Sequence, residues 1–156
     1  MTTDPTAALL DQPEVSPELF GYLSTDPVAE LLGIEFTSIK PGYACATMTV
    51  THRLLNAPGG AHGGAMMALI DVVHAAVSNS HGVLAVAQDV HTEFLNGGVE
   101  GDVLVCEGVE VNCTKRTAVY RIDVRAHGRD KLLATALARV FRIGTPLTGT
   151  ETPANA

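Results

Sequence analysis

The chain has 156 residues, 46% of them hydrophobic and only 4% aromatic, and its formal net charge at pH 7 is −7. This length suits one domain with a full core, and the acidic balance argues against a nucleic-acid partner, which favours a basic surface. The scattered cysteines Cys45, Cys106 and Cys113 have no disulfide or metal-ligand spacing, so we expect reduced thiols and no bound metal. Neither a transmembrane stretch nor a secretory leader is visible in the sequence, so we expect a cytoplasmic protein with no membrane contact.

Short helices and a hairpin are predicted in the first third of the chain. Residues 1–16 have weak periodicity, which favours a frayed tail. Asp26 as a cap, Pro27 in the first turn and Gly33 as a stop predict a helix over 26–32. The remaining elements predicted here are a short helix over 16–23 and paired strands over 34–39 and 43–50.

One long helix and four strands are predicted after the hairpin. Residues 65–77 are apolar except for Asp71 and His74, so a helix here should be buried on all sides. The predicted strands follow over 83–94, 102–111, 117–126 and 132–143. Two strands, one buried helix and four more strands predict an α+β fold, in which an antiparallel sheet of about six strands curls around the helix.

The domain limits follow from these elements. We expect a tail and a short helix over 1–25, the α+β domain over 26–143, and a disordered tail over 144–156, where Thr, Pro, Gly, Glu and Asn dominate.

The central helix carries an unusual carboxylate. Helical spacing places Asp71, His74 and Ser78 on one stripe, with Met67 and Ala75 beside them. A buried Asp is rare unless it is paired, so one interpretation is an Asp71–His74 ion pair in the core. The other interpretation is a catalytic acid.

Glycines at the start of this helix favour the catalytic interpretation. Gly63 and Gly64 follow His62 and allow close approach of a ligand to backbone N–H groups that have no helical acceptor. The helix N-terminus also favours negative charge, as on a developing oxyanion. A carboxylate and a backbone oxyanion site are a minimal apparatus for acyl transfer. A helix cap that needs glycine only for packing is the alternative.

These residues together resemble the hotdog-fold thioesterases. The resemblance rests on His62-Gly63-Gly64, on the acid Asp71 in the following helix and on Asn56 ahead of them. Residues 85–94 and 116–119 also look like this family, and the similarity spans roughly residues 28–143. The chain is most similar to the phenylacetate-degradation (PaaI-like) acyl-CoA thioesterases, relatives of the Arthrobacter-type 4-hydroxybenzoyl-CoA thioesterase.

The resemblance implies a hotdog fold, an acyl-CoA substrate, no cofactor besides the CoA of the substrate, and dimers that pair into tetramers. It implies a catalytic set of Asn56, His62, Gly63 and Asp71. Residues expected to bind the substrate are Gly64, Met67, His74, Ala75, His91, Thr92 and Phe94, with Lys115, Arg116 and Thr117 near the CoA phosphates. The alternatives are a solvated strand face for His91 and Thr92, a solvated turn for the basic pair, and a role for His62 in ordering the glycines.

Spacing alone predicts a dimer. Gly63 and Asp71 are eight residues apart, about 12 Å along a helix axis, so one thioester carbon cannot touch both. If both act on one substrate, they come from two antiparallel helices. Asp71 would then be a general base or a nucleophile. A hotdog hydratase or dehydratase and a non-catalytic acyl-CoA-binding protein are the competing functions.

Overall fold

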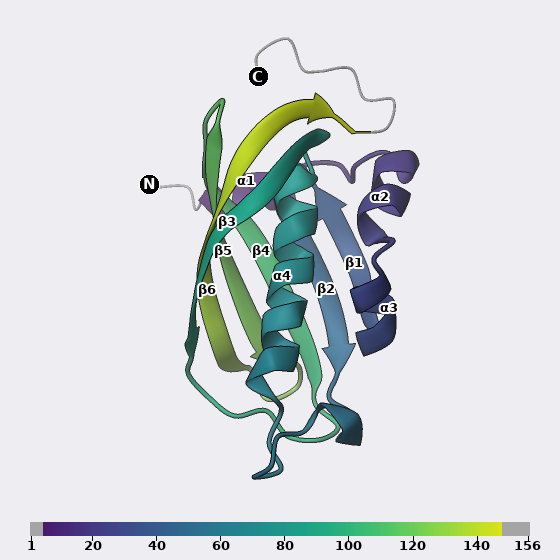
Figure 1. The fold of residues 1–156 in the computed structure, drawn as a ribbon, viewed down its shortest axis with the longest axis vertical. Helices are drawn as coiled ribbons and strands as arrows, with labels where there is room; N and C mark the ends of the chain where they lie inside the picture. Colours follow the sequence, from purple (N-terminus) through teal and green to yellow (C-terminus); the bar gives the residue numbers. More distant parts are fainter. Residues whose placement is uncertain (1–4, 148–156) are drawn as a thin grey trace.

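A computed structural model of the chain describes residues 5–147. It contains four α-helices, one 3-10 helix and six strands within that range (Figure 1). In chain order they are α1 (Pro5–Leu10), α2 (Pro17–Ser24), α3 (Pro27–Leu32), β1 (Ile34–Lys40), β2 (Tyr43–Thr49), η1 (His52–Leu54), α4 (Gly63–Asn79), β3 (Val83–Phe94), β4 (Val103–Cys113), β5 (Thr117–Ala126) and β6 (Lys131–Pro146).

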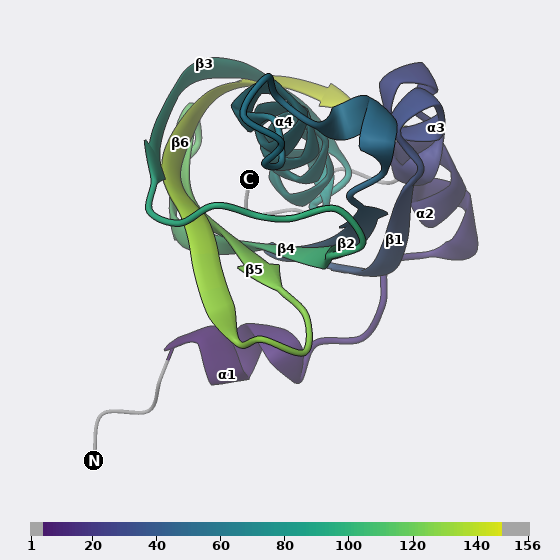
Figure 2. The ribbon, with the colours of Figure 1, turned by 90° about the horizontal axis from the view of Figure 1, so that it is seen from below.

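The six strands form one antiparallel sheet in the order β1-β2-β4-β5-β6-β3. The sheet curls around α4, as the view along that helix shows (Figure 2). This arrangement confirms the predicted α+β hotdog fold. None of the described helices is long and apolar enough to cross a membrane.

Local sequence signals explain the short helices. The Asp26 carboxylate accepts the N–H groups of Val28 and Ala29 at 2.7 and 3.0 Å, and Gly33 ends α3 in the left-handed conformation. Both signals confirm the predicted caps of this helix. The helices α2 and α3 lie beside β1 and α4 in Figure 1.

The core lies between α4 and the inner face of the sheet. Tyr120, Ile122 and Val124 of β5 are fully buried there, as their alternation predicted. Gly108 of β4 allows the helix to come close, because a Cβ at this position would lie 3.0 Å from a methyl carbon of Val73. The position of α4 is therefore fixed by tight packing against the sheet.

The helix α4 is not buried on all sides, in contrast to the prediction. Its sheet-facing residues are buried, but Gly64, Asp71 and Ala75 are exposed and Met67 is half-buried. The sheet curls around only part of the helix circumference, so one apolar stripe stays uncovered within this chain. We call Gly64, Met67, Asp71 and Ala75 the open stripe.

The N-terminal segment differs from the frayed tail that was expected. Leu9 of α1 packs on Tyr43, Cys45 and Val109 on the outer face of the sheet. Further along, the Glu14 carboxylate accepts the Ile39 N–H at 2.8 Å. A pair of apolar residues in a short polar segment gave too weak a periodicity to predict this docking. Residues 1–4 of the expected tail lie outside the described residues.

The last strand is longer than predicted. β6 continues past Ile143 to Pro146, and Leu147 is buried, with its N–H donating to the Gly82 carbonyl at 2.8 Å. Residues 148–156 of the expected C-terminal tail lie outside the described residues.

Candidate active site

The N-terminus of α4 presents one unused backbone donor. His62 is the N-cap, and its Nδ1 accepts the Gly64 N–H at 2.9 Å. The N–H of Gly63, the first helical residue, has no acceptor among the described residues. The ring of Phe94 covers Gly63, since a Cβ there would lie 3.4 Å from Cζ of Phe94. Of the two glycines, only Gly63 therefore has an N–H without an acceptor in residues 5–147, and His62 acts as a cap that orders them.

Asn56 shapes the loop that leads to this helix. Its Oδ1 accepts the Gly60 N–H at 2.9 Å, its own N–H donates to the Gly60 carbonyl at 2.8 Å, and its carbonyl accepts the Gly59 N–H at 2.9 Å. The loop is also tied to the segment before β4, because the Ala61 N–H donates to the Gly98 carbonyl at 2.9 Å. These bonds give Asn56 a positioning role within the chain.

Asp71 is exposed on the open stripe. It forms no ion pair with His74 or any other described residue. The buried pair considered from the sequence is therefore wrong, because Asp71 is exposed on the open stripe whereas the His74 side chain, three residues further on, is buried on the core side. Within residues 5–147, this carboxylate has no ion-pair partner, and the other members of its stripe are small or apolar.

His74 faces the core instead. It is 1% exposed, and its ring centroid lies 5.8 Å from that of Tyr120, with the planes tilted by 58°. Burial lowers the pKa of His74, and the nearby negative charge of Asp71 opposes this only in part. The imidazole is therefore neutral at pH 7 and brings no positive charge to Asp71.

The residues of β3 divide between the two faces of the sheet. His91 lies opposite the exposed Leu137 and pairs with Glu93 at 3.0 Å, so it is on the outer face, away from α4. Thr92 and Phe94 lie opposite buried residues of β6 and are on the inner face. The Thr92 hydroxyl is buried and has no partner among the described residues. Of this segment, Thr92 and Phe94 face the side of the sheet that carries Gly63.

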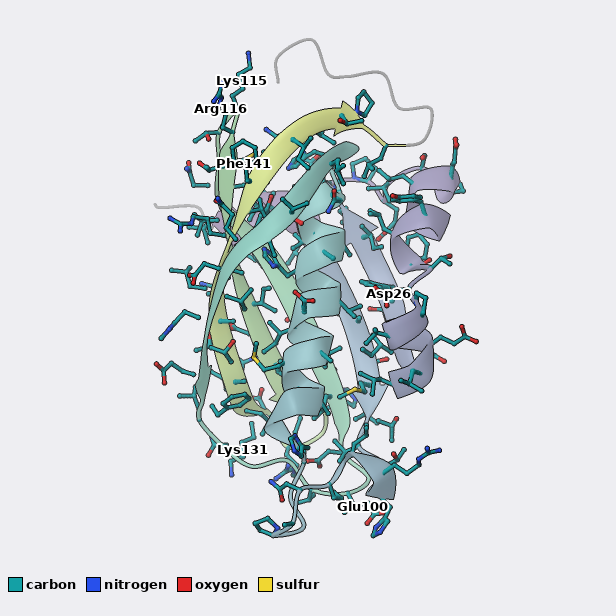
Figure 3. All side chains as sticks on the ribbon, viewed as in Figure 1. Asp26, Glu100, Lys115, Arg116, Lys131 and Phe141 are labelled. Atoms are coloured by element: carbon teal, nitrogen blue, oxygen red, sulfur yellow. The ribbon has the colours of Figure 1, made fainter. Side chains whose placement is uncertain are left out.

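The basic pair lies at the other end of the molecule. Figure 3 shows Lys115 and Arg116 far from Glu100, which belongs to the loop region around Gly63. They line a hollow of about 450 Å³ together with Val83, Phe141, Arg142, Ile143 and Gly144. Thr117 closes the hairpin, since its N–H donates to the Thr114 hydroxyl at 3.0 Å.

Arg142 is a member of this basic group that the sequence prediction missed. Its side chain donates to the Thr114 carbonyl at 2.8 Å, and its backbone N–H donates to the Arg116 carbonyl at 2.8 Å. The signal was an arginine near the end of a mostly apolar strand, but only the pairing of β5 with β6 brings it beside Arg116.

A second hollow adjoins the open stripe. It has a volume of about 550 Å³ and is lined by Tyr22, Leu23, Thr25, Asp26, Ala75, Asn79 and Leu84. Ala75 lies one helical turn beyond Asp71, so this hollow begins next to the carboxylate. Its walls combine Tyr22 and Leu23 of α2, Leu84 of β3 and the methyl group of Ala75 with the polar side chains of Thr25, Asp26 and Asn79.

Comparison with known proteins identifies the class. A model of the thioesterase superfamily matches residues 58–133. The acyl-coenzyme A thioesterase PaaI of Escherichia coli is 36% identical over 124 residues, which cover 80% of this chain and 88% of that protein. The chain therefore belongs to the thioesterase superfamily, and its fold is the hotdog fold of that family.

Solved structures place it near the PaaI proteins. The E. coli PaaI protein from the phenylacetic acid degradation operon has a TM-score of 0.79 at 34% identity, covering 83% of this chain and 93% of that one. A mutant of the phenylacetic acid degradation protein PaaI from Thermus thermophilus has a TM-score of 0.72 at 36% identity, covering 76% and 100%. A Streptococcus mutans protein bound to acetyl CoA has a TM-score of 0.69 at 29% identity, covering 72% and 90%.

Proposed function

We propose that the protein hydrolyses acyl-CoA thioesters to a free acid and CoA, and that each active site is built from two chains. The observation that carries this proposal is Asp71 on the open stripe of α4, where neither its carboxylate nor the Gly63 N–H at the helix start has a partner in the described part of the chain. The names of the relatives, an acyl-CoA thioesterase and a protein bound to acetyl CoA, support the substrate class.

The two groups require two chains because of their separation. Eight residues of helix hold Gly63 and Asp71 about 12 Å apart along the axis. Two α4 helices packed antiparallel along their open stripes bring Gly63 of one chain beside Asp71 of the other. Met67, midway between them in the sequence, then lies at the two-fold axis. The dimer also covers the apolar stripe that the sheet leaves exposed.

The reaction follows from these positions. The thioester carbonyl oxygen accepts the Gly63 N–H, which stabilises the oxyanion as it forms. Asp71 of the second chain takes a proton from water, whose oxygen attacks the carbonyl carbon; collapse breaks the C–S bond, and the CoA sulfur leaves with a proton. Direct attack by the Asp71 carboxylate, followed by hydrolysis of the mixed anhydride, uses the same geometry.

The basic pair Lys115 and Arg116 fits this two-chain site. An antiparallel partner brings its own C-terminal end of α4, and with it the hairpin carrying Lys115 and Arg116, toward the Gly63 end of the first chain. Arginine and lysine there can bind the CoA phosphates. His91, on the outer face of the sheet, is not part of this site in our proposal.

The acyl group belongs in the hollow beside Ala75. Aromatic acyl groups such as phenylacetyl, and medium-chain acyl groups, are the substrates we propose. The methyl group of Ala75 offers no hydrogen bond to a 4-hydroxyl, so we expect phenylacetyl-CoA to be preferred over 4-hydroxybenzoyl-CoA.

The test is the release of CoA thiol from a panel of acyl-CoA esters by the wild type and by Asp71→Asn and Asp71→Ala. Both variants change a side chain that is exposed within its own chain, so each chain should fold as the wild type does; circular dichroism checks the fold, and size-exclusion chromatography checks that the dimer still forms. Loss of hydrolysis with retained acyl-CoA binding is the expected result. Unchanged hydrolysis would disprove the role of Asp71, and binding without turnover by the wild type would favour a non-catalytic acyl-CoA-binding protein.

A further inference from the structure

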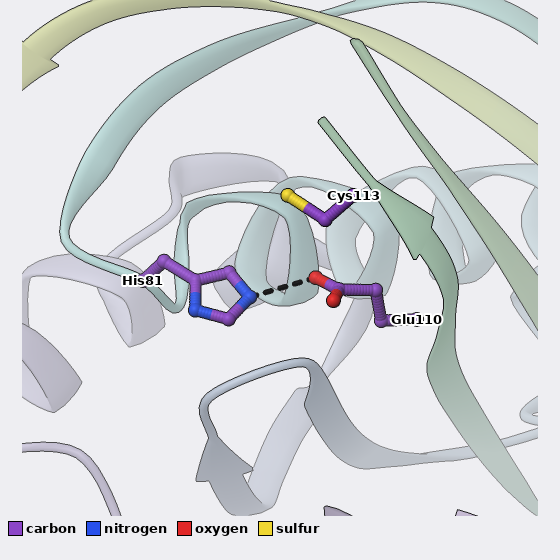
Figure 4. A group of neighbouring side chains, drawn as sticks. All are labelled: His81, Glu110 and Cys113. Carbon is purple, nitrogen blue, oxygen red and sulfur yellow. Dashed lines mark hydrogen bonds and ion pairs between the residues drawn. The ribbon is translucent and has the colours of Figure 1, made fainter. Parts of the chain in front are cut away.

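Three ligand-type side chains meet at the end of α4 opposite Gly63. His81 follows the helix, Glu110 and Cys113 lie on β4, and one ligand atom from each lies within 4.8 Å of the other two. His81 Nε2 is 2.7 Å from Glu110 Oε2. Figure 4 shows the three side chains converging on one space. We call them the His81–Glu110–Cys113 cluster.

A β-bulge creates this cluster. Residues three apart on a regular strand point to opposite faces, so Glu110 and Cys113 should not meet. The register shifts between Glu110 and the residues after it, which leaves Val111 as the extra residue, 60% exposed. As a result Glu110 lies opposite Tyr120 and Cys113 opposite Ala118, both buried on the inner face. Bulges commonly re-aim side chains next to functional sites.

The turn that carries His81 is also anchored. The Ser80 hydroxyl donates to the Val77 carbonyl at 2.7 Å and accepts the Gly42 N–H at 2.8 Å. Gly82 then adopts a φ of 73°, which turns the chain back into β3. His81 is therefore held against β4 by two fixed neighbours rather than by a free loop.

The metal-ligand atoms of the cluster are partly shielded from solvent, and they are not all occupied by strong hydrogen bonds among the described residues. The side chains of His81 and Glu110 are 29% and 17% exposed. Cys113 is half-buried, and its one hydrogen bond among the described residues is a weak contact to the Thr114 carbonyl at 3.7 Å. The Tyr120 hydroxyl, fully buried and directly across from Glu110, has no partner among the described residues.

We propose that the cluster binds one Zn²⁺ ion per chain through His81 Nε2, the Glu110 carboxylate and Cys113 Sγ, with the fourth position taken by water. Imidazole, carboxylate and thiolate are the ligands that zinc accepts in tetrahedral sites, and three protein ligands with a water are a common set. The thiolate favours zinc over Mg²⁺ and Ca²⁺, which take oxygen ligands. The Tyr120 hydroxyl is placed beside Glu110 to bond the coordinated water or the carboxylate.

The geometry needs only a small adjustment. Ligand atoms of a tetrahedral zinc site lie about 3.3–3.6 Å apart, given metal–ligand bonds of about 2.0–2.3 Å. In the cluster, His81 Nε2 and Glu110 Oε2 are 2.7 Å apart, and no two of the ligand atoms are more than 4.8 Å apart. This range of separations includes the spacing that zinc requires. Metal entry replaces the His81–Glu110 hydrogen bond by two bonds to the ion.

Zn²⁺ binding at the cluster is coupled to the release of a proton from Cys113. Burial raises the pKa of Cys113, the charge of Glu110 adds to this, and the positive charge of Arg142 opposes it. Zinc binds cysteine as the thiolate, so Zn²⁺ binding forms the Zn–S bond and releases the thiol proton to the buffer.

This site is independent of the proposed thioesterase chemistry. It uses no residue assigned to the thioesterase reaction, and within one chain it lies at the end of α4 opposite Gly63, beside the hairpin that carries Lys115 and Arg116. Its metal ligands were missed in the sequence because His81, Glu110 and Cys113 lack the short spacings typical of zinc motifs, and the bulge that pairs the last two has no clear sequence signal.

The test is a Co²⁺ titration of chelator-treated, reduced, untagged full-length protein, followed by displacement with Zn²⁺. We expect one Co²⁺ per chain, d–d bands of tetrahedral intensity and a thiolate-to-cobalt charge-transfer band, all lost when Zn²⁺ displaces the cobalt. Cys113→Ser should abolish the charge-transfer band, whereas Cys45→Ser, a matched control on the outer face of the sheet, should keep it.

Two further variants test the other ligands without depending on the thiol. His81→Gln and Glu110→Gln should each weaken Zn²⁺ binding, measured by competition with a chromophoric chelator, at least about 10-fold. Circular dichroism shows whether each variant is folded. Absence of stoichiometric cobalt binding by the wild type, or a charge-transfer band that survives in folded Cys113→Ser protein, would overturn the proposal.

Discussion

Replacing Gly63 by proline removes the proposed oxyanion donor at a position where the helix tolerates proline. Gly63 is the first residue of α4, where proline is well tolerated because the N–H has no helical acceptor. The preceding residue, His62, has φ −69° and ψ 129°. This is the extended conformation that a residue before proline prefers, at ψ of about 120–160°. The helix and its cap should therefore survive the substitution.

The matched control is Gly63→Ala, which keeps the N–H. Both side chains place a Cβ near the Phe94 ring, where an added Cβ would lie 3.4 Å from Cζ, an ordinary contact. The difference between the two variants therefore reports the loss of the N–H together with the ring Cδ that takes the place of its hydrogen. Removal of one oxyanion donor costs about 2.7–4 kcal/mol of transition-state stabilisation, or about 100- to 1,000-fold in kcat.

The assay is thiol release from phenylacetyl-CoA under saturating conditions. We expect Gly63→Ala to keep most of the activity and Gly63→Pro to fall about 100- to 1,000-fold below it. Thermal unfolding should show no loss of stability in the proline variant, because proline restricts the unfolded chain. Equal kcat values in two folded variants would refute the assignment of the Gly63 N–H.

Three further predictions concern association, pH and CoA binding. Met67→Lys should place two like charges at the proposed two-fold axis, so sedimentation should show monomers with no thioesterase activity; an active dimer would contradict the proposed packing. Burial lowers the pKa of His74, so the unfolded chain binds that proton more tightly, and stability should fall as pH drops below about 6.5. In the His74→Phe variant, the fall of Tm below about pH 6.5 should disappear. If Tm of this variant falls with pH as steeply as that of the wild type, His74 is not the cause. Reversing the charges of Lys115 and Arg116 should raise KM for CoA esters and spare N-acetylcysteamine thioesters, whereas equal losses would argue against a phosphate site.

Local signals predicted the fold well. The caps of α3 depend on Asp26, Pro27 and Gly33 alone, and these residues adopt the expected roles. The bounds of β3 and β5 agree with the prediction, because turns rich in glycine and polar residues flank both strands. Alternation also predicted the buried face of β5. Helix caps, turns and strand alternation depend on residues that are close together in the chain, so they can be recognised in the sequence directly.

Features that depend on tertiary packing were harder to predict. The exposure of Asp71 depends on how far the sheet curls around α4, which no local pattern records. The outer position of His91 depends on the strand register of β3 and β6. Arg142 joins the basic hairpin only through strand pairing, and the bulge at Val111 reverses which residues of β4 face inward. In each case the side chain was visible in the sequence, but its neighbours were not.

The most direct test of the two-chain site is complementation between inactive variants. Asp71→Asn and Gly63→Pro chains, co-expressed and purified together, form mixed dimers with one site that has both a native Gly63 and a native Asp71. Random pairing of the two chains should restore roughly a quarter of wild-type activity, because half of the dimers are mixed and one of their two sites is intact. If the mixture is no more active than either variant alone, although the mixed dimers are present, the two groups do not act across an interface.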